Sequence, residues 1–304
     1  MRYLVLFCLV VSAFADIEDH FKKVTGKESY VSSMRNVDFI YLINLDQRPE
    51  KWAHCVESLA PYGILPYRFS AVNGWELSWE AIVDVGVPYE PWMDKGWVAT
   101  WYPKDIEGRT ENEVFGTPGK TYFMKGLTRG GIGITLSHLS ILQDAWDSGY
   151  ETIWIMEDDI EVIQNPHLIS DLIEELDAVV GKKKWDVLFT DPDTKNQQGE
   201  YVPCPYFAWR PNFVPRNQHR FAQVEEVSPH LRKLGARYGA YSMIIRRSGI
   251  KKLLDFLINN HIFLPYDMEY TLPNTIRLFV STQDIVSTQP QAATDNGTPN
   301  YLGR

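Results

Sequence analysis

The sequence predicts an α/β fold with a mostly parallel, Rossmann-like sheet that helices cover on both faces. Short apolar runs of strand length alternate with segments whose apolar residues recur at helical spacing. Glycine and proline stand at many of the junctions, where the chain must turn. Strands that alternate with helices in this way favour parallel pairing, since each helix returns the chain to the same edge of the sheet.

The first elements expected are a strand, a helix and a second strand. Residues 39–45 form an apolar run, and Pro49 opens a segment with apolar residues at helical spacing. Residues 67–72 give the second strand, which an Asn-Gly pair closes. Periodicity is then lost over 75–127, which holds five of the ten tryptophans, so an irregular aromatic-rich insertion is expected there.

The alternation resumes after the insertion. We expect helices over 132–146, 168–180 and 248–257, and strands over 152–156, 185–190 and 240–245. Segment 191–237 is rich in proline, arginine and aromatic residues and is expected to be loop.

The composition is that of a folded globular protein. Of the 304 residues 44% are hydrophobic and 23% are charged, which excludes extensive disorder. The 39 acidic residues outnumber the 30 basic ones, the net charge is -9, and no basic block occurs. This charge argues against nucleic acid as a partner. No repeat or flexible linker divides the chain, so one compact catalytic unit is expected.

The N-terminus has the pattern of a cleavable signal peptide. Met1 and Arg2 precede an apolar run over 3–11, and small residues then precede Asp16. A membrane anchor would need about 20 apolar residues. We therefore expect a signal peptide over 1–15 and an N-terminal extension over 16–36. The mature protein would have no transmembrane segment and would be periplasmic, secreted or in the endoplasmic reticulum lumen.

Removal of the signal peptide would leave Cys55 and Cys204. In an oxidising compartment they could form one disulfide. Two thiols do not specify a pairing, so free and partly buried cysteines are the alternative.

The strongest chemical signal is the acidic triplet Glu157-Asp158-Asp159, which directly follows the strand over 152–156. Ligands bind α/β sheets at the carboxyl ends of strands. Adjacent carboxylates repel each other, and a hard divalent cation stabilises such a cluster. That cation would hold a diphosphate and neutralise its charge as it leaves. An exposed acidic turn is the alternative, which the preceding apolar strand disfavours.

Two weaker patterns accompany the triplet. Glycines 130, 131 and 133 precede a helix with Ser137 and His138, so backbone could approach a phosphate there. A lone histidine is, however, more often structural than catalytic. Asp191-Pro192-Asp193 also follows a strand, and its proline and polar continuation indicate a turn that lines the site.

Six segments stand out in order along the chain. The first reads FIYLINLDQRPEKW over 39–52, and the others are residues 68–74, 130–138, 155–159, 240–254 and 266–269. In this order they resemble the segments of glycosyltransferase family 25, whose opening pattern is INLDxRxxRW. That family includes bacterial lipooligosaccharide galactosyltransferases and collagen hydroxylysine galactosyltransferases. Together the six segments span roughly 37–290.

The resemblance implies a GT-A fold over 37–300, a UDP-sugar donor, usually UDP-galactose, a Mn²⁺-type cation and inversion at the anomeric carbon. Asp158 and Asp159 would bind the metal, and Glu157 would orient them or a donor hydroxyl. The donor pocket would be lined by Asn44, Arg48, Asn73 and the segment from Gly131 to His138, with Ser137.

An inverting reaction needs a carboxylate that accepts the proton of the acceptor hydroxyl. The resemblance points to Asp267 first and to Glu269 second. The alternative is that both cap a strand or pair with an arginine such as Arg237. Two departures from the family stand out: Asn73 replaces the usual Asp, and no histidine follows His261 to serve as a metal ligand.

The segments over 75–127 and 191–237 flank the family-like motifs and are expected on the acceptor side, because aromatic rings stack on sugars. Ordinary packing of the insertion is the alternative for most of its tryptophans. The function expected is transfer of a hexose, galactose by the resemblance, to a glycan, glycoprotein or glycolipid. The alternatives are a non-catalytic glycan- or nucleotide-binding relative and an exported glycoside hydrolase with carboxyl groups ~5 or ~6.5–9.5 Å apart.

Overall fold

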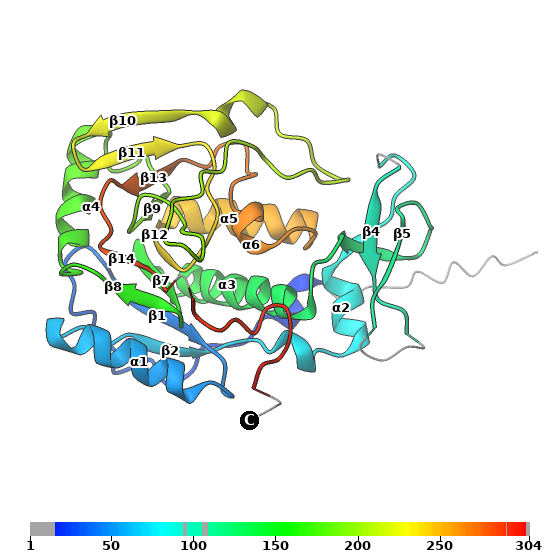
Figure 1. Ribbon diagram of the computed structural model, residues 1–304, viewed down its shortest axis with the longest axis horizontal. Coiled ribbons are helices and arrows are strands. Elements are labelled where there is room, and N and C mark those ends of the chain that lie inside the picture. Colours follow the sequence, from blue (N-terminus) through cyan, green and yellow to red (C-terminus); the bar gives the residue numbers. More distant parts are fainter. Residues whose placement is uncertain (1–15, 94–95, 105–108, 290, 302–304) are drawn as a thin grey trace, which may run out of the picture.

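A computed structural model describes residues 16–93, 96–104, 109–289 and 291–301. The expected signal peptide lies outside the described residues. An eight-stranded sheet forms the centre, in the order β10-β11-β13-β9-β12-β7-β1-β2 (Figure 1). Its strands are β1 (Phe39–Asn44), β2 (Tyr67–Ser70), β7 (Thr152–Glu157), β9 (Val187–Phe189), β10 (Val224–Ser228), β11 (Leu231–Leu234), β12 (Ser242–Arg246) and β13 (Leu278–Ser281).

The sheet is mixed, so the prediction of a mostly parallel sheet is wrong. β1 pairs in parallel with β2 and β7, and β13 pairs in parallel with β9. β12 is antiparallel to both of its neighbours, and β11 is antiparallel to β10 and β13. The cause is the connection between β9 and β12, which contains no α-helix and so does not return the chain as a crossover helix would.

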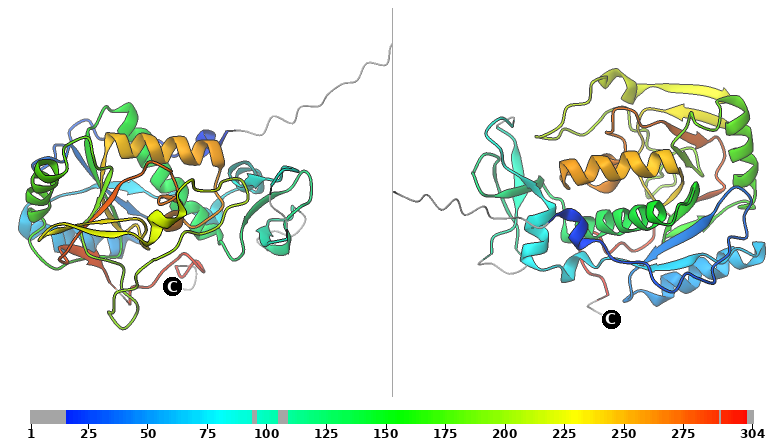
Figure 2. Two further views of the ribbon diagram at one scale, coloured as in Figure 1. Left: turned by 90° about the horizontal axis from the view of Figure 1, so that it is seen from above. Right: turned by 180° about the vertical axis from the view of Figure 1, so that it is seen from behind.

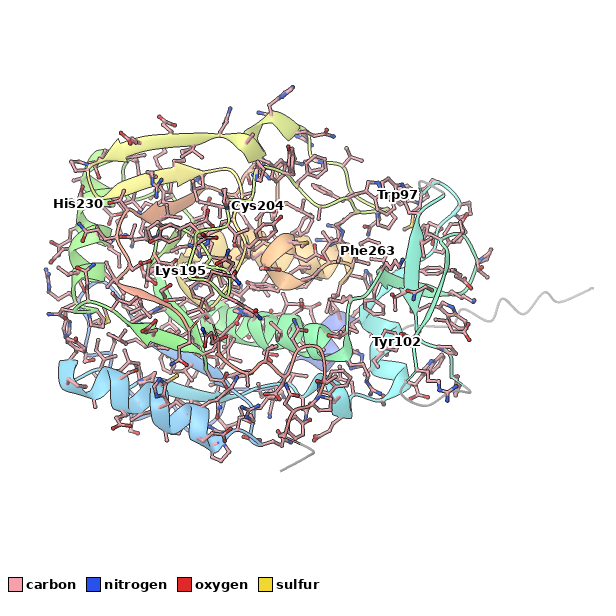
Figure 3. The ribbon with its side chains drawn as sticks, viewed as in Figure 1. Trp97, Tyr102, Lys195, Cys204, His230 and Phe263 are labelled. Atoms are coloured by element: carbon pink, nitrogen blue, oxygen red, sulfur yellow. The ribbon has the colours of Figure 1, made fainter. Side chains whose placement is uncertain are left out.

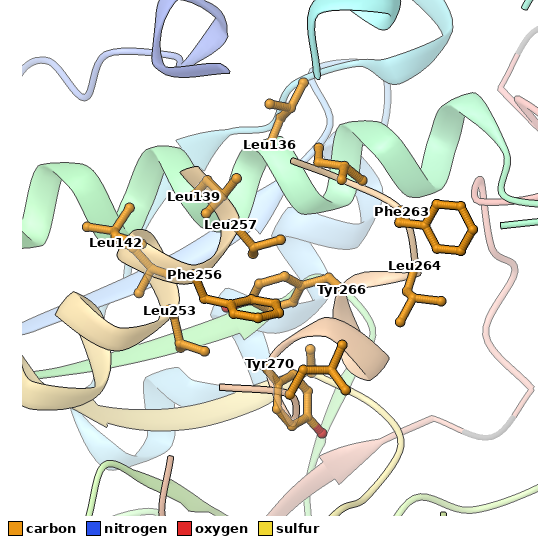
Figure 4. Close-up of a cluster of buried hydrophobic side chains, with 14 of the residues drawn as sticks. Leu136, Leu139, Leu142, Leu253, Phe256, Leu257, Phe263, Leu264, Tyr266 and Tyr270 are labelled. Atoms are coloured by element: carbon orange, nitrogen blue, oxygen red, sulfur yellow. The ribbon is translucent and has the colours of Figure 1, made fainter. Parts of the chain in front are cut away.

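Helices cover both faces, as predicted. Figure 2 shows α3 and α5 side by side on one face, and α1 and α4 cover the other. The bounds are α1 (Pro49–Leu59), α2 (Trp79–Val85), α3 (Arg129–Asp147), α4 (Leu168–Val179), α5 (Arg247–Asn260) and α6 (Tyr266–Glu269). Figure 4 shows leucines of α3 and α5 packed around Tyr266 and Tyr270, so this core fixes the position of α6.

Two segments predicted to be irregular are ordered. The insertion over 75–127 holds α2 and a small antiparallel sheet in the order β3-β6-β4-β5. These strands are β3 (Val87–Pro88), β4 (Val98–Trp101), β5 (Glu111–Val114) and β6 (Thr121–Met124). They escaped prediction because β5 is mostly exposed and β6 mostly buried, so neither alternates clearly. Segment 191–237 likewise contains the hairpin of β10 and β11.

A two-stranded sheet completes the fold and was not predicted. β8 (Ile160–Val162) follows the acidic triplet at once and pairs with β14 (Val286–Thr288). Cys55 and Cys204 are both free thiols, so the possible disulfide is not formed. Among the described helices, none combines the length and apolar character that crossing a membrane requires.

Candidate active site

The acidic triplet lies at the carboxyl end of β7, near the middle of the sheet. Ile43 of β1 is the partner of Glu157 in the parallel register, so Asn44 ends its strand beside the triplet. A pocket with a cavity volume of about 100 Å³ opens here. It is lined by residues 43–45, 51, 71–75, 130, 134, 137, 157–159 and 294–296.

Asp158 is held by the last residue of β1 and by a lysine of α1. The Asn44 amide donates to Asp158 Oδ2 at 2.7 Å, and Lys51 Nζ of α1 lies 3.2 Å from Asp158 Oδ1. Arg68 Nε donates to Asn44 Oδ1 at 2.8 Å and so fixes the orientation of the amide. Among the described residues, Lys51 is the one lysine or arginine that bonds the triplet directly, so one fixed positive charge faces three carboxylates.

The excess of carboxylates over positive charge is reflected in the pKa values of Asp159 and Glu157. Burial, together with the charges of Glu157 and Asp158, raises the pKa of Asp159 to about 7. Burial and the charges of Asp267 and Asp158 raise the pKa of Glu157 to about 8, although its side chain stays 26% exposed. Asp159 Oδ1 is buried and, within the described ranges, has no hydrogen-bond partner. When its carboxylates are ionised, the cluster therefore carries more negative charge than Lys51 balances, and Asp159 Oδ1 has no partner among the described residues.

A divalent cation suits this donor set. The described residues bring together no group of three His, Cys, Asp or Glu side chains able to hold a metal ion. Hard cations of the Mg²⁺ type are commonly bound by one or two carboxylates together with waters and ligand phosphates, and Mn²⁺ shares their preference for oxygen. Asp158 and Asp159 Oδ1 are the oxygens that could serve as the protein ligands of such a cation.

The N-terminal part of α3 reaches the pocket through close packing on the chain after β2. A Cβ on Gly133 would lie 2.5 Å from Gly74 N, so only glycine allows this approach. Ser137 lines the pocket, and its hydroxyl accepts from Val72 N at 2.8 Å. Gly131 does not line it, and its N–H donates to Thr128 Oγ1. That amide is therefore already used, which argues against the predicted contact with a donor phosphate.

His138 supports the triplet from behind. It is fully buried, its Nε2 lies 2.9 Å from Glu157 Oε1, and its ring stacks on Tyr266 at 4.0 Å. Burial lowers the pKa of His138 to about 3, so the ring is neutral at physiological pH and Nε2–H can donate to the carboxylate. His138 does not line the pocket, so the structure places it as an orienting group and not as the predicted donor contact.

The two predicted base candidates of α6 have different surroundings. Asp267 is half-buried, accepts from Gly239 N at 3.1 Å, and is close enough for its charge to raise the pKa of Glu157. Burial raises the pKa of Asp267 itself. Glu269 is fully buried: one oxygen pairs with Arg210, and the other accepts from Phe263 N and Leu264 N. Glu269 therefore has a structural position, and the structure does not support a catalytic role for it.

Arg237 pairs with neither of these residues. It binds Asp191 at 2.8 Å, and Asp191 also accepts from Tyr241 and Ser287. The Asp191 carboxylate is thus fixed inside the protein, not exposed in a site-lining turn.

The family model for glycosyltransferase family 25, described as an LPS biosynthesis protein family, matches residues 37–269. The chain belongs to glycosyltransferase family 25. The match covers most of the chain and includes the triplet and both carboxylates of α6. Family 25 membership removes the ground for the glycoside hydrolase alternative.

Curated family 25 proteins are distant relatives. The human "Inactive glycosyltransferase 25 family member 3" is 27% identical over 54% of this chain and 23% of its own length. The Drosophila melanogaster "Glycosyltransferase 25 family member" is 24% identical over 59% of this chain and 24% of its own. The Bos taurus "Probable inactive glycosyltransferase 25 family member 3" is 24% identical over 73% and 29%. The matches thus cover less than a third of each relative's length.

Arg48 is separated from the pocket of this family 25 domain, whereas Asn73 lines it. Arg48 Nε binds Glu50, and its Nη1 binds Asp295 Oδ2 at 2.5 Å. Asp295 in turn lines the pocket. Sequence reasoning missed Lys51 and residues 294–296 as pocket residues, and it assigned Trp75 to the acceptor side. Lys51 falls inside the opening family 25 motif, which was the available signal; nothing in the sequence marked 294–296.

The aromatic insertion meets the rest of the family 25 domain through stacked rings. Trp97 stacks on Trp209 at 4.8 Å, and Trp209 packs edge-on against Phe263, which precedes α6. Figure 3 places Trp97 on the insertion and Phe263 on the body of the protein. Trp97 stays 51% exposed, whereas Trp79 is half-buried against the core and donates to Tyr102 O. Packing therefore accounts for some of these tryptophans, and Trp97 offers a free face.

Proposed function

We propose that the chain is an inverting, metal-dependent hexosyltransferase with a GT-A fold. It would transfer galactose, or a related hexose, from a UDP-sugar to a glycan, glycoprotein or glycolipid acceptor in an exported compartment. The observation that carries this proposal is the triplet at the end of β7. Within the described part of the chain, Lys51 is the one lysine or arginine that bonds it, and Asp159 Oδ1 has no hydrogen-bond partner. Family 25 membership supports glycosyl transfer as the reaction class.

In this reaction Asp158 and Asp159 would hold a Mn²⁺-type cation, which supplies charge neutralisation for the departing diphosphate. Asn44 orients Asp158 through its 2.7 Å hydrogen bond. His138 orients Glu157, which faces the same pocket and can bind a hydroxyl of the donor. These contacts position the donor and leave proton transfer to another group.

Asp267, which does not line the pocket but whose charge reaches Glu157 at its edge, is the proposed base. Its carboxylate would take the proton of the acceptor hydroxyl as the new glycosidic bond forms and the bond from the anomeric carbon to the diphosphate oxygen breaks. A raised pKa suits this task, because a stronger base accepts the proton more readily while it is ionised. The free face of Trp97 is the proposed stacking surface for an acceptor sugar ring.

The test is a screen of UDP-sugars with Mn²⁺, in which transfer and donor hydrolysis are followed by mass spectrometry. We expect Asp159→Asn and Asp267→Asn each to lower turnover by about 100-fold or more. Asp147→Asn, which removes an exposed charge of α3, is the matched control and should keep full turnover. Unchanged turnover in Asp159→Asn would show that the metal assignment is wrong.

A non-catalytic relative is the second candidate, since two of the relatives compared above carry "inactive" in their names. Such a protein would bind UDP and Mn²⁺ but release no product with any UDP-sugar. Retained binding without turnover in wild-type protein would select this candidate.

A further inference from the structure

One wall of the pocket comes from the last described residues of the chain. Thr294, Asp295 and Asn296 line it, although they lie beyond the family match over 37–269. We call residues 294–301 the strap. In Figure 1 the strap, drawn in red, crosses the first turns of α3. A Cβ on Gly130 would lie 2.5 Å from Asn296 O, which confirms that the two segments touch.

Side chains from two other segments hold the strap. Trp75 Nε1 donates to Asp295 O at 2.9 Å. Thr128, the N-cap of α3, donates to Asn296 through its hydroxyl, with distances of 2.5 Å to the backbone oxygen and 2.9 Å to Oδ1. The strap itself contains no helix or strand. It is therefore fastened by a few polar contacts and lacks a backbone ladder that would make it rigid.

A third contact of the strap is the ion pair between Asp295 and Arg48, which buries the Arg48 side chain. The Arg48 and Asp295 side chains are 3% and 7% exposed, and their ion pair is 2.5 Å long. Asp295 lines the pocket and Arg48 does not, so the partner that buries Arg48 is itself a pocket residue. The opposite side of the guanidinium is held by Glu50, which is largely exposed and would keep its contact without the strap.

The cavity is too small for the proposed donor while the strap is in place. Its volume is about 100 Å³, whereas pockets for drug-sized ligands measure about 300–1,000 Å³. The other walls are the ends of β1 and β7, the first turns of α3, Lys51 of α1 and residues 71–75, which follow β2. The strap, which is held by a few polar contacts, is the wall most easily displaced to make room for a nucleoside diphosphate.

We propose that the strap is a displaceable wall and that Asp295 competes with the diphosphate of the donor for Arg48. On donor binding, Arg48 would release the Asp295 carboxylate and bind phosphate oxygens instead. A planar guanidinium can form paired hydrogen bonds with either group. Asp295 thereby sets the affinity of the donor, because binding must first break the ion pair. The proposal rests on the proposed function, since it takes a nucleoside diphosphate as the ligand of the pocket.

The test is calorimetric titration of UDP with Mn²⁺ into full-length wild-type protein and Asp295→Ala. Removing a charge-assisted hydrogen bond that ligand binding must otherwise break should tighten the UDP affinity about tenfold or more. Tyr301→Phe removes the 2.8 Å contact between Asn73 and the strap without touching Arg48, and it should tighten binding by a smaller factor. Asp147→Ala, at an exposed position of α3, should leave the affinity unchanged.

The outcomes separate the two proposals. Tighter binding in both strap variants supports the displaceable wall. Unchanged or weaker binding in the strap variants, with normal binding by wild type, overturns it and leaves the proposed function intact, since the strap would then be a fixed part of the donor site. Absence of UDP binding in every protein overturns both.

Discussion

Two sets of buried carboxylates differ in how their charge is balanced. Asp186, Asp191 and Glu269 are fully buried, and each forms an ion pair with arginine. The Asp186 carboxylate also binds Lys252, so burial is more than offset and its pKa is lowered. The triplet over 157–159 is less deeply buried than these three carboxylates. Among the described residues, Lys51 is the one lysine or arginine that pairs with it.

The difference shows how structural and functional acids can be told apart. A carboxylate matched by fixed cations gains nothing from a further positive ligand, because its charge and hydrogen bonds are already satisfied. Burial raises the pKa of Glu269 as it does those of Glu157 and Asp159, so the pKa alone does not separate the two sets. Among the described residues Asp159 Oδ1 has no hydrogen-bond partner, and a mobile cation would stabilise it. The charge excess at the end of β7 is therefore the part of the molecule suited to ligand binding.

The largest effect on stability is expected when a buried arginine–carboxylate ion pair is broken. Arg210→Met leaves Glu269 charged, fully buried and without its cation, so it should lower the free energy of unfolding by about 3–5 kcal/mol. Urea denaturation followed by circular dichroism measures this change. Lys251→Met, which breaks the exposed pair with Asp255, is the control and should cost less than about 0.5 kcal/mol. Equal costs for the two variants would remove the basis of the comparison.

A smaller and selective effect is expected at His138. His138→Phe keeps an aromatic ring against Tyr266 but removes the N–H that donates to Glu157. Loss of such an orienting partner typically costs 10–100-fold in metal affinity or activity. The affinity for UDP with Mn²⁺ should fall by about that factor, with little change in the urea midpoint. A fall in stability without a change in affinity would mark His138 as purely structural.

The smallest effect expected is a gain in stability, which depends on pH. The pKa of Asp159 is raised from 3.8 to about 7 in the folded protein, so the folded state holds this proton more tightly than the unfolded state does. The stabilisation is present at low pH and is lost as pH rises towards about 7. In metal-free protein at pH 8, Asp159→Asn should therefore raise the free energy of unfolding by about 1 kcal/mol, an advantage that disappears near pH 4.

Thermal melts across this pH range, with a chelator present, measure the difference between wild type and variant. A variant that is less stable than wild type at pH 8 would show that the charge of Asp159 is already compensated.

The sequence predicted those features that neighbouring residues encode. The triplet directly after an apolar strand predicted its place at the end of β7, and the opening motif led to Asn44 beside it. The pairing of Glu269 with Arg210, and of Arg48 with Asp295, joins residues far apart in sequence. No local period records such contacts, so Glu269 was predicted to be catalytic and the strap was missed.

The direction of the strands was a second feature that could not be predicted from the sequence. The apolar run that forms β12 predicts a buried strand, but its residues are the same whether it runs parallel or antiparallel. Direction is set by the long connection after β9, whose hairpin of β10 and β11 was read as loop because the β10 residues are largely exposed and do not alternate. The prediction of a mostly parallel sheet failed for this reason.

The central claim is that the unmatched charge of the triplet is a cation site for a diphosphate ligand. Calorimetric titration of UDP into wild-type protein and Asp159→Asn, each with Mn²⁺ and with a chelator, tests it most directly. We predict that wild type binds UDP at least about tenfold more tightly with Mn²⁺ than without it, and that Asp159→Asn loses this dependence. An affinity that is the same with and without Mn²⁺ in wild type, or a metal dependence that survives in Asp159→Asn, would contradict the claim.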